Sequence, residues 1–427
     1  MNMKIIIKIS IIQLISISSS LFASFFSKEN FNNVAVIVNS ELYPRVKDSI
    51  DLYISDLKNE GYEAVFSEWN YKEHPDAEEL RNTLKAYHEN NQIQGAVLIG
   101  ELPYIQRKDI NNNKGPIDIY LMDFNNDHFI KENDGDIKIP NSIHADIWVS
   151  RIWAPKDKGL FEGISEAKLI KNYFKKNHAY RTCQSPVPDL KIRFEAGEMP
   201  NWFFRTAEYL KTWIDFYQQL SKAGYSEEYL KFVRENPAQF LYLQSHSTSQ
   251  FHNFKHFDRN IEFLSSKEIV SKAKNQQPFL LLNACSACNF LDSYSLGNAY
   301  LFDINSKTLV IAGLSVLDGS LLDIAYLYSN GDNFGNNVLP SIGKFGIFRY
   351  IEPLFVAISF TPLATHILDK HATIYIVIVF EFLKYYYEYT FGWRSFGNVL
   401  LGDPTLKSYV DMAWCPEYID KSVLKDL

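Results

Sequence analysis

Cysteine is scarce in this chain, which has four cysteines among 427 residues, at positions 183, 285, 288 and 415. So few and so scattered cysteines exclude a disulfide-rich scaffold, and hydrophobic burial must hold the fold. Hydrophobic residues make up 46% of the chain and aromatic residues 15%, which excludes disordered and fibrous classes. A single bridge between Cys183 and Cys415 stays open for an exported protein.

Long blocks of basic residues are also absent. Lys and Arg number 43 against 50 Asp and Glu, the formal net charge is -7, and the two signs are evenly mixed along the chain. Because nucleic-acid binding relies on clustered positive charge, we expect no nucleic-acid partner.

The N-terminus lacks a full membrane span. Residues 1–27 combine Lys4 and Lys8, an apolar stretch and small residues near Ala23, as an export signal does. A membrane anchor is the alternative, but three consecutive serines dilute the apolar stretch, which falls short of the roughly 20 residues that a span needs. We therefore expect a signal peptide over 1–27, no transmembrane span in the mature chain, and a secreted, periplasmic or cell-surface location.

Strands and helices alternate along the rest of the chain, which predicts an α/β fold with a mostly parallel sheet. A helix is expected after residue 42, ending at Gly61, and another after the capping residue Asp76. A long helical region is expected from Phe203 to Tyr229. The expected core strands cover 34–39, 62–69, 95–103, 145–154, 190–196, 239–247, 277–285, 308–315 and 397–406.

We expect two adjoining subdomains. An N-terminal α/β subdomain covers 30–155, and a catalytic subdomain covers 156–410. Within the second, 331–395 is an unusually apolar segment that we expect to pack in the core rather than cross a membrane. A short tail, 411–427, follows.

An acidic, Asn-rich stretch near residues 118–142 suggests a cation site. Its carboxylates and the backbone oxygens between them fit the six to eight oxygen ligands that calcium takes. The spacing matches no strict calcium loop, so a solvated loop rich in turns is the equal alternative. The candidate ligands of a structural calcium ion are Asp123, Asp127, Asp134 and Asp136.

Two predicted strands end in chemically active side chains. His246 stands near the end of "FLYLQSHS", and Cys285 follows 39 residues later, directly after "FLLLNA". Because the carboxyl ends of parallel strands share one edge of a sheet, these residues are expected to lie close together. A thiol beside an imidazole makes a nucleophile and its base, and needs no cofactor. Taken alone, Cys285 would be interpreted as a buried core cysteine, and His246 as an ordinary histidine at a strand end.

The pair Cys285 and Cys288 allows two other interpretations. A C-x-x-C pair with His252 and His256 nearby would suit zinc, but a second close thiolate pair, usual in structural zinc sites, is absent. A thioredoxin-like redox pair normally opens a helix, whereas this one closes a core strand.

At these residues the chain resembles the gingipain-type cysteine peptidases, whose catalytic fold is caspase-like. The resemblance extends from near residue 34 to 406 and follows the order of the family. It is carried by "GAVLIGELPYI", "PIDIYLMDFNNDHF", "ADIWVSRIWA", "YFKKNHAYRT", "FLYLQSHS", "PFLLLNACSACNF" and "FGNVLLGDPTL".

The resemblance implies a caspase-like three-layer sandwich and assigns roles to individual residues. His246 matches the catalytic histidine and Cys285 the nucleophile, whereas Cys288 matches no catalytic position. The backbone N–H groups of Ser247 and Cys285 would form the oxyanion hole. A glutamate of "RFEAGE", Glu195 or alternatively Glu198, would orient the imidazole, and calcium binding is frequent in the family.

The sequence departs from the family in two respects. The best-known members have Gly immediately after the histidine, where this chain has Ser247, and the segment 331–395 has no clear counterpart. We expect an exported cysteine endopeptidase that acts on protein or peptide substrates through an acyl-enzyme. The alternative is a catalytically inactive, gingipain-like surface or secretion-associated binding module.

Overall fold

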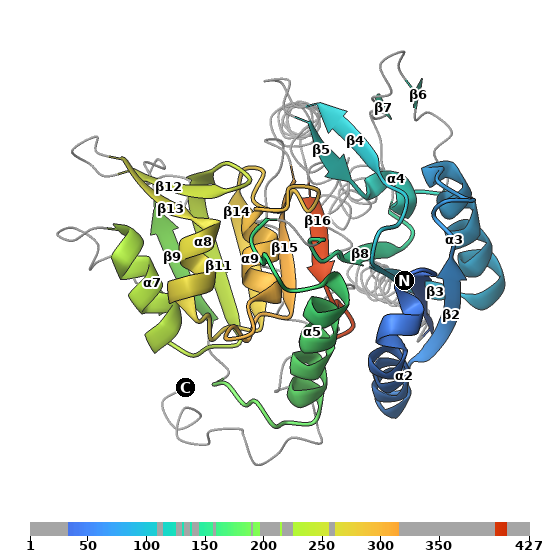
Figure 1. Ribbon diagram of the computed structural model, residues 1–427, viewed down its shortest axis with the longest axis horizontal. Helices are drawn as coiled ribbons and strands as arrows, with labels where there is room; N and C mark the ends of the chain where they lie inside the picture. The colour runs from blue at the N-terminus through green and yellow to red at the C-terminus, as the bar shows by residue number, and fades with distance from the viewer. Residues whose placement is uncertain are drawn as a thin grey trace, which may run out of the picture. The chain divides into compact units, whose positions relative to one another are not determined.

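The computed structural model (Figure 1) shows an α/β fold built on one large sheet. The predicted signal peptide, the apolar segment 331–395 and the tail 411–427 lie outside the residues that it describes. Those residues are 33–108, 114–124, 130–131, 137–138, 145–156, 159–188, 191–196, 214–215, 225–255, 261–315 and 398–407.

Ten strands form the continuous path of the sheet, in the order β10-β9-β11-β14-β15-β16-β8-β3-β1-β2. Their bounds are β1 (Asn33–Asn39), β2 (Glu63–Trp69), β3 (Ile93–Ile99), β8 (Trp148–Ile152), β9 (Lys191–Ala196), β10 (Ile214–Asp215), β11 (Phe240–Ser247), β14 (Phe279–Ala284), β15 (Val310–Leu314) and β16 (Asn398–Gly402). The strands β12 (Phe251–Lys255) and β13 (Ile261–Ser265) extend from β11, and β4 (Ile105–Lys108) with β5 (Lys114–Ile117) and β6 (Ile130–Lys131) with β7 (Ile137–Lys138) form separate ribbons.

Helices connect many of these strands. They are α2 (Tyr43–Asn59), α3 (Ala77–Asn91), α4 (Ile119–Met122), α5 (Glu166–Arg181), α7 (Tyr225–Glu235), α8 (Ser266–Glu268) and α9 (Leu296–Phe302), with a π-helical turn, η3 (Ile269–Ala273). The predicted helix ends are confirmed: Asp76 accepts a hydrogen bond from the Glu78 N–H at the start of α3, and Gly61, with φ +84°, follows α2. The positive φ favours glycine at this stop.

The sheet consists of two blocks of parallel strands that run in opposite directions. Every pair along the path is parallel except β15 with β16, which is antiparallel. The predicted boundary at residue 155 follows β8, and the sheet continues across it because β16 lies between β15 and β8. As a result β9, β11, β14 and β15 have their carboxyl ends at one shared edge.

The strand predictions agree with the structure, but one helix prediction does not. Within the region expected to be helical from Phe203 to Tyr229, Ile214 and Asp215 form β10, which pairs with β9. Here sheet pairing overrides the helical pattern of a strongly aromatic stretch. Within the described part of this region, helix α7 begins at Tyr225.

A buried polar network ties the end of β16 to α2 and α5. The carboxylate of Asp403, which is fully buried, accepts hydrogen bonds from Tyr53 (2.9 Å), Asn177 (2.7 Å), Arg181 (2.5 Å) and Thr405 (2.6 Å). Burial alone would raise the pKa of Asp403, but the Arg181 charge and these hydrogen bonds lower it below its usual value. The "GDPTL" segment therefore has a structural role.

The first residue of that segment, Gly402, has to be glycine. Its φ is +94°, and a Cβ at this position would lie 1.9 Å from the backbone oxygen of Leu309. Only glycine fits, because the chain here turns against the loop that leads into β15.

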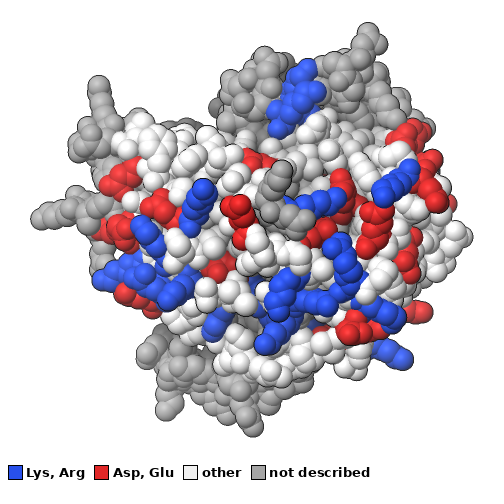
Figure 2. Space-filling view, viewed as in Figure 1, with Lys and Arg blue, Asp and Glu red and all other residues white. Residues whose placement is uncertain are grey.

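The surface carries mixed charge. Figure 2 shows acidic and basic side chains interspersed over the visible face. In the described part of the chain, no helix has the length and apolarity needed to cross a membrane.

Candidate active site

His246 and Cys285 lie together at the edge of the sheet where β9, β11, β14 and β15 have their carboxyl ends. β11 and β14 are parallel neighbours, and their last paired residues are Ser245 and Ala284. His246 and Cys285 are the next residues on each chain. Neighbouring strands lie about 5 Å apart, so the backbones of these two residues are adjacent.

The same register places both residues on one face of the sheet. Residues alternate between faces along a strand. Tyr242, Gln244 and Asn283 share a face, because the Asn283 amide donates to the Tyr242 hydroxyl (3.0 Å), which donates to the Gln244 side chain (3.2 Å). His246 continues this row on β11 and Cys285 continues it beyond β14.

A tight turn presents Cys285. The Ala287 N–H donates to the Ala284 carbonyl (3.2 Å), and Ser286 has φ +57°, a left-handed conformation that a serine rarely adopts. Strained backbone of this kind concentrates at functional sites. Cys285 carries a reduced thiol and is partly exposed, and His246 is exposed, so both are open to a substrate.

Ser247 lies against the turn of Cys285. Its hydroxyl donates to the Cys285 carbonyl (2.5 Å). The Thr248 N–H bonds the Phe251 carbonyl (2.9 Å) and closes the hairpin to β12, so the next pair, Ser247 with His252, has backbone groups that point away from the partner strand. The Ser247 N–H accordingly faces away from β12.

Asp292 joins the histidine hairpin to the cysteine loop. Its carboxylate accepts hydrogen bonds from the Ser249 hydroxyl (2.6 Å) and the Gln250 amide (3.0 Å) in the turn between β11 and β12. The Leu296 N–H also donates to the Ser249 carbonyl (2.7 Å). These contacts fix the two candidate catalytic segments relative to each other.

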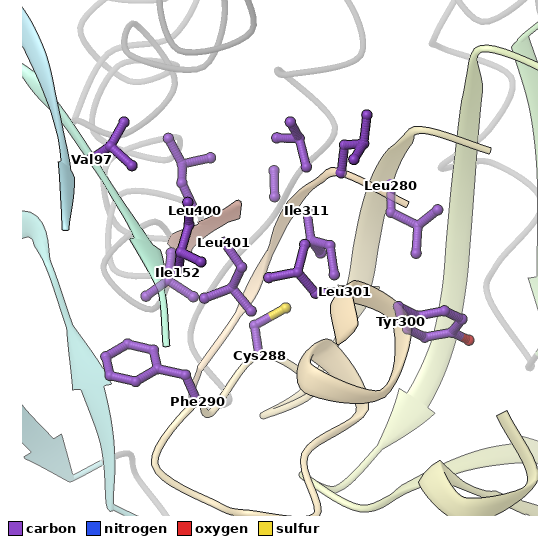
Figure 3. Packing of buried hydrophobic residues seen from close by; sticks show 14 of the residues in the cluster. Val97, Ile152, Leu280, Cys288, Phe290, Tyr300, Leu301, Ile311, Leu400 and Leu401 are labelled. Carbon is purple, nitrogen blue, oxygen red and sulfur yellow. The ribbon is translucent and has the colours of Figure 1, made fainter. Parts of the chain in front are cut away.

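Cys288 differs from Cys285 in its exposure to solvent, on which the reactivity of a thiol depends. It is fully buried among apolar side chains that include Leu301 and Ile311 (Figure 3). Its sulfur lies against β15, where a Cβ on Gly313 would be 2.1 Å from it. Burial raises the pKa of the Cys288 thiol, which keeps it protonated. The structure thus agrees with the interpretation that Cys288 packs rather than reacts.

On the opposite face of the sheet lies a buried group of hydrogen-bonded side chains, of which the sequence indicated only His252, as a possible zinc ligand. The His252 ring contacts the Ser245 hydroxyl (3.0 Å) and the Tyr300 hydroxyl (3.1 Å), which in turn meets the Tyr229 hydroxyl (2.7 Å). Full burial lowers the pKa of His252 to about 3, so this imidazole is neutral at ordinary pH. These hydrogen bonds hold Ser245, the residue of β11 that directly precedes His246.

His252 should make folding sensitive to acid. The unfolded chain takes up a proton at this residue below its ordinary pKa of about 6.5, whereas the folded chain does so only near pH 3. Stability from His252 is therefore lost as pH falls between these values, by roughly 1.4 kcal/mol per pH unit. We expect the stability difference between wild type and His252→Gln to shrink at that rate from pH 6 to 4 in urea unfolding. The exposed His74→Gln variant is the control, and a difference that does not change with pH would contradict the assignment.

The other predicted site residues have different outcomes. Glu195 pairs with Gln244 across β9 and β11, and Gln244 stands two residues before His246. Glu198 lies outside the described residues.

The calcium hypothesis stays a prediction. Asp123 is buried at the end of α4, and its carbonyl accepts hydrogen bonds from Arg81 (2.6 and 3.1 Å). The other candidate ligands, Asp127, Asp134 and Asp136, lie outside the described residues. Within the described part of the chain, no group of three His, Cys, Asp or Glu residues is arranged to hold a metal ion.

Asn253 is a further candidate site residue, which the sequence did not indicate. It is the direct cross-strand partner of His246 in the pairing of β11 with β12. Its buried Oδ1 atom has no hydrogen-bond donor within the described ranges. Cross-strand partners have Cβ atoms about 5 Å apart, so this acceptor is within reach of the imidazole.

Comparison with known proteins adds no identification, since no protein-family description and no curated protein sequence matches this chain.

Proposed function

We propose that the chain is an exported cysteine endopeptidase with a caspase-like, three-layer fold and two adjoining subdomains, similar to the gingipain-type peptidases. The observation that carries the proposal is the placement of His246 and Cys285. They follow the last pair of two adjacent parallel strands, on the same face, with the cysteine on a strained turn. A nucleophile beside its base at an open sheet edge is the arrangement that acyl transfer requires.

The first half of the reaction forms an acyl-enzyme. The Cys285 thiolate attacks the carbonyl carbon of the scissile bond, and the electron pair of the C=O bond moves to oxygen. The backbone N–H groups of Ser247 and Cys285 stabilise this oxyanion. The His246 imidazolium then protonates the amine nitrogen as the C–N bond breaks, leaving a thioester on Cys285.

The second half releases the acid product. Neutral His246 removes a proton from water, which attacks the thioester carbonyl carbon. The carbon–sulfur bond then breaks and the thiolate returns. The net reaction consumes one water molecule and one peptide bond, and no redox partner is needed.

The imidazole needs an acceptor that holds its second ring nitrogen. Glu195 is the group implied by the resemblance, and its place in the sheet, diagonal to His246, is compatible with that role. Asn253 is a second candidate, because it lies directly opposite His246 and has an unpaired oxygen within the described part of the chain. Either residue would act as a positioning residue.

The bonding state of Cys183 is compatible with export. This cysteine is disulfide-bonded, whereas Cys285 and Cys288 carry reduced thiols. Disulfides persist mainly in secreted and periplasmic proteins, which suits the predicted signal peptide. The partner suggested for Cys183, Cys415, lies outside the described residues.

Thiol labelling tests the assignment. We expect iodoacetamide and a peptide-based electrophile to modify native wild type on Cys285 alone, with and without calcium, as read by peptide mass mapping. Cys285→Ala should lose the label, and Cys288→Ala should keep it, because only the exposed thiol can reach the reagent. His246→Ala should slow the peptide electrophile about tenfold or more.

Two results would overturn the proposal. Loss of labelling and proteolysis in Cys288→Ala, but not in Cys285→Ala, would show that Cys288 and not Cys285 is the nucleophile. A wild type that cleaves nothing in a broad peptide library under reducing conditions would favour the alternative, an inactive binding module. Labelling of urea-unfolded Cys285→Ala at Cys288 controls for reagent quality.

A further inference from the structure

The sheet face that carries His246 continues into a group of exposed apolar side chains. In the hairpin of β12 and β13, Phe251, Ile261 and Phe263 are 39%, 51% and 60% exposed. The rings of Phe251 and Phe263 lie 6.5 Å apart, edge to face. We call these three residues the apolar shelf.

The strand register places the shelf on the same face as the candidate catalytic histidine. His246 pairs with Asn253, and Asn253 pairs with Phe263, so these three residues form one row across β11, β12 and β13. Phe251 and Ile261 flank the row on the same face, since each lies two residues from a member of it.

The residues of the opposite face confirm this division. His252, which alternates with Phe251 and Asn253, is fully buried, and its partner across the hairpin, Leu264, is buried as well. Glu262 accepts hydrogen bonds from the Ser226 N–H (3.0 Å) and hydroxyl (2.6 Å) at the start of α7. The face of the hairpin that carries His252, Glu262 and Leu264 therefore points toward the protein interior, and the face that carries the apolar shelf points toward solvent.

Leaving such side chains in water has a free-energy cost that a soluble surface normally avoids. Burying a Phe side chain contributes about 1.5–3 kcal/mol. Three adjacent apolar side chains are too few for a stable dimer, in which each partner buries roughly 800 Å². A single apolar side chain of a bound peptide matches the size of the shelf.

Resting on the proposed peptidase function, we propose that the apolar shelf binds an aromatic or large aliphatic side chain of the peptide substrate. Phe263 lies two strands beyond His246, a distance of roughly 10 Å. An extended peptide advances about 3.3 Å per residue, so the recognised side chain stands about three residues from the scissile bond. The shelf makes the enzyme selective for an apolar residue at that position.

Peptide cleavage measures this selectivity. A library that varies each position near the scissile bond should show a preference for Phe, Tyr, Trp, Leu or Ile about three residues away. For the best such peptide, Phe263→Ser and the double variant Phe251→Ser/Phe263→Ser should lower kcat/KM by about 10- to 100-fold. The matching peptide with Ala at that position should be cleaved equally by all variants. Phe66→Ser, an exposed aromatic position on β2, is the control and should leave both rates unchanged.

The outcomes separate the shelf from the function it rests on. Cleavage without an apolar preference, or an equal loss for the aromatic and the Ala peptide in Phe263→Ser, would overturn the shelf and leave the peptidase standing. Absence of both cleavage and Cys285 labelling in wild type would overturn both proposals together.

Discussion

Cys285→Ala is expected to lower kcat for peptide hydrolysis by at least about 1,000-fold, because alanine offers no atom to form the acyl-enzyme. His246→Ala should cause a loss of similar size, since the thiolate and the proton for the leaving amine both depend on the imidazole. The measurement is single-turnover and steady-state hydrolysis of the best library peptide.

The double variant makes the test specific. When a nucleophile and its base act as one unit, removing both costs about as much as removing either. We therefore expect Cys285→Ala/His246→Ala to be no slower than the single variants within about threefold. Multiplicative losses, or a Cys285→Ala enzyme with more than about a tenth of the wild-type kcat, would exclude the dyad. Cys288→Ala is the matched control and should keep its kcat.

Asp403→Ala is expected to destabilise the fold by about 3–5 kcal/mol, the usual cost of removing one partner from a buried ion pair. The change removes one of the two carboxylates, Asp403 and Glu60, that accept hydrogen bonds from the almost fully buried Arg181 guanidinium. It also removes the acceptor of the hydrogen bonds that Tyr53 and Asn177 donate to Asp403. The free energy of unfolding from urea titration, compared with wild type at the same pH, gives the size of the loss.

Two further variants separate this network from a general effect of removing a carboxylate. Asp51→Ala removes an exposed carboxylate that pairs with Lys47 one helical turn away, and should cost less than about 0.5 kcal/mol. Arg181 also pairs with the buried Glu60 carboxylate, so Glu60→Gln/Arg181→Met/Asp403→Leu removes all three charges of this group. This triple variant should recover part of the loss, since well-packed apolar groups replace buried ion pairs at little cost. Equal losses in Asp51→Ala and Asp403→Ala would contradict the structural role of Asp403. If Asp403→Ala yields no soluble protein while the triple variant does, the structural role of Asp403 is supported.

The regular elements and the two candidate catalytic residues were accessible from sequence because their signals are local. Apolar runs and alternation predicted β11 and β14, and the position of His246 and Cys285 relative to those runs predicted their meeting. Ile214 and Asp215 show the limit, since a two-residue edge strand is determined by its neighbour β9 and not by its own pattern.

The supporting residues were not accessible, because their partners lie far away in the chain. Tyr53 meets Asp403 across 350 residues, so "GDPTL" could be recognised as a motif without revealing its buried network. The sequence indicated His252 only as a possible zinc ligand and gave no role to Asn253. Only the register of β12 against β11 shows that Asn253 is the neighbour of His246 and that His252 faces the other way. Cys288 was separated from Cys285 by sequence position, and its burial against Gly313 supplies the physical reason.

The position of β16 also determines when the chain can finish folding. This strand comes from residues 398–402, yet it fills the gap between β8 and β15 in the middle of the sheet. Until it arrives, the two blocks have no shared strand, and the edges of β8 and β15 offer unpaired backbone groups to other chains. Contacts of such large sequence separation close slowly, so the nascent protein is most prone to aggregation before β16 is available to pair with β8 and β15.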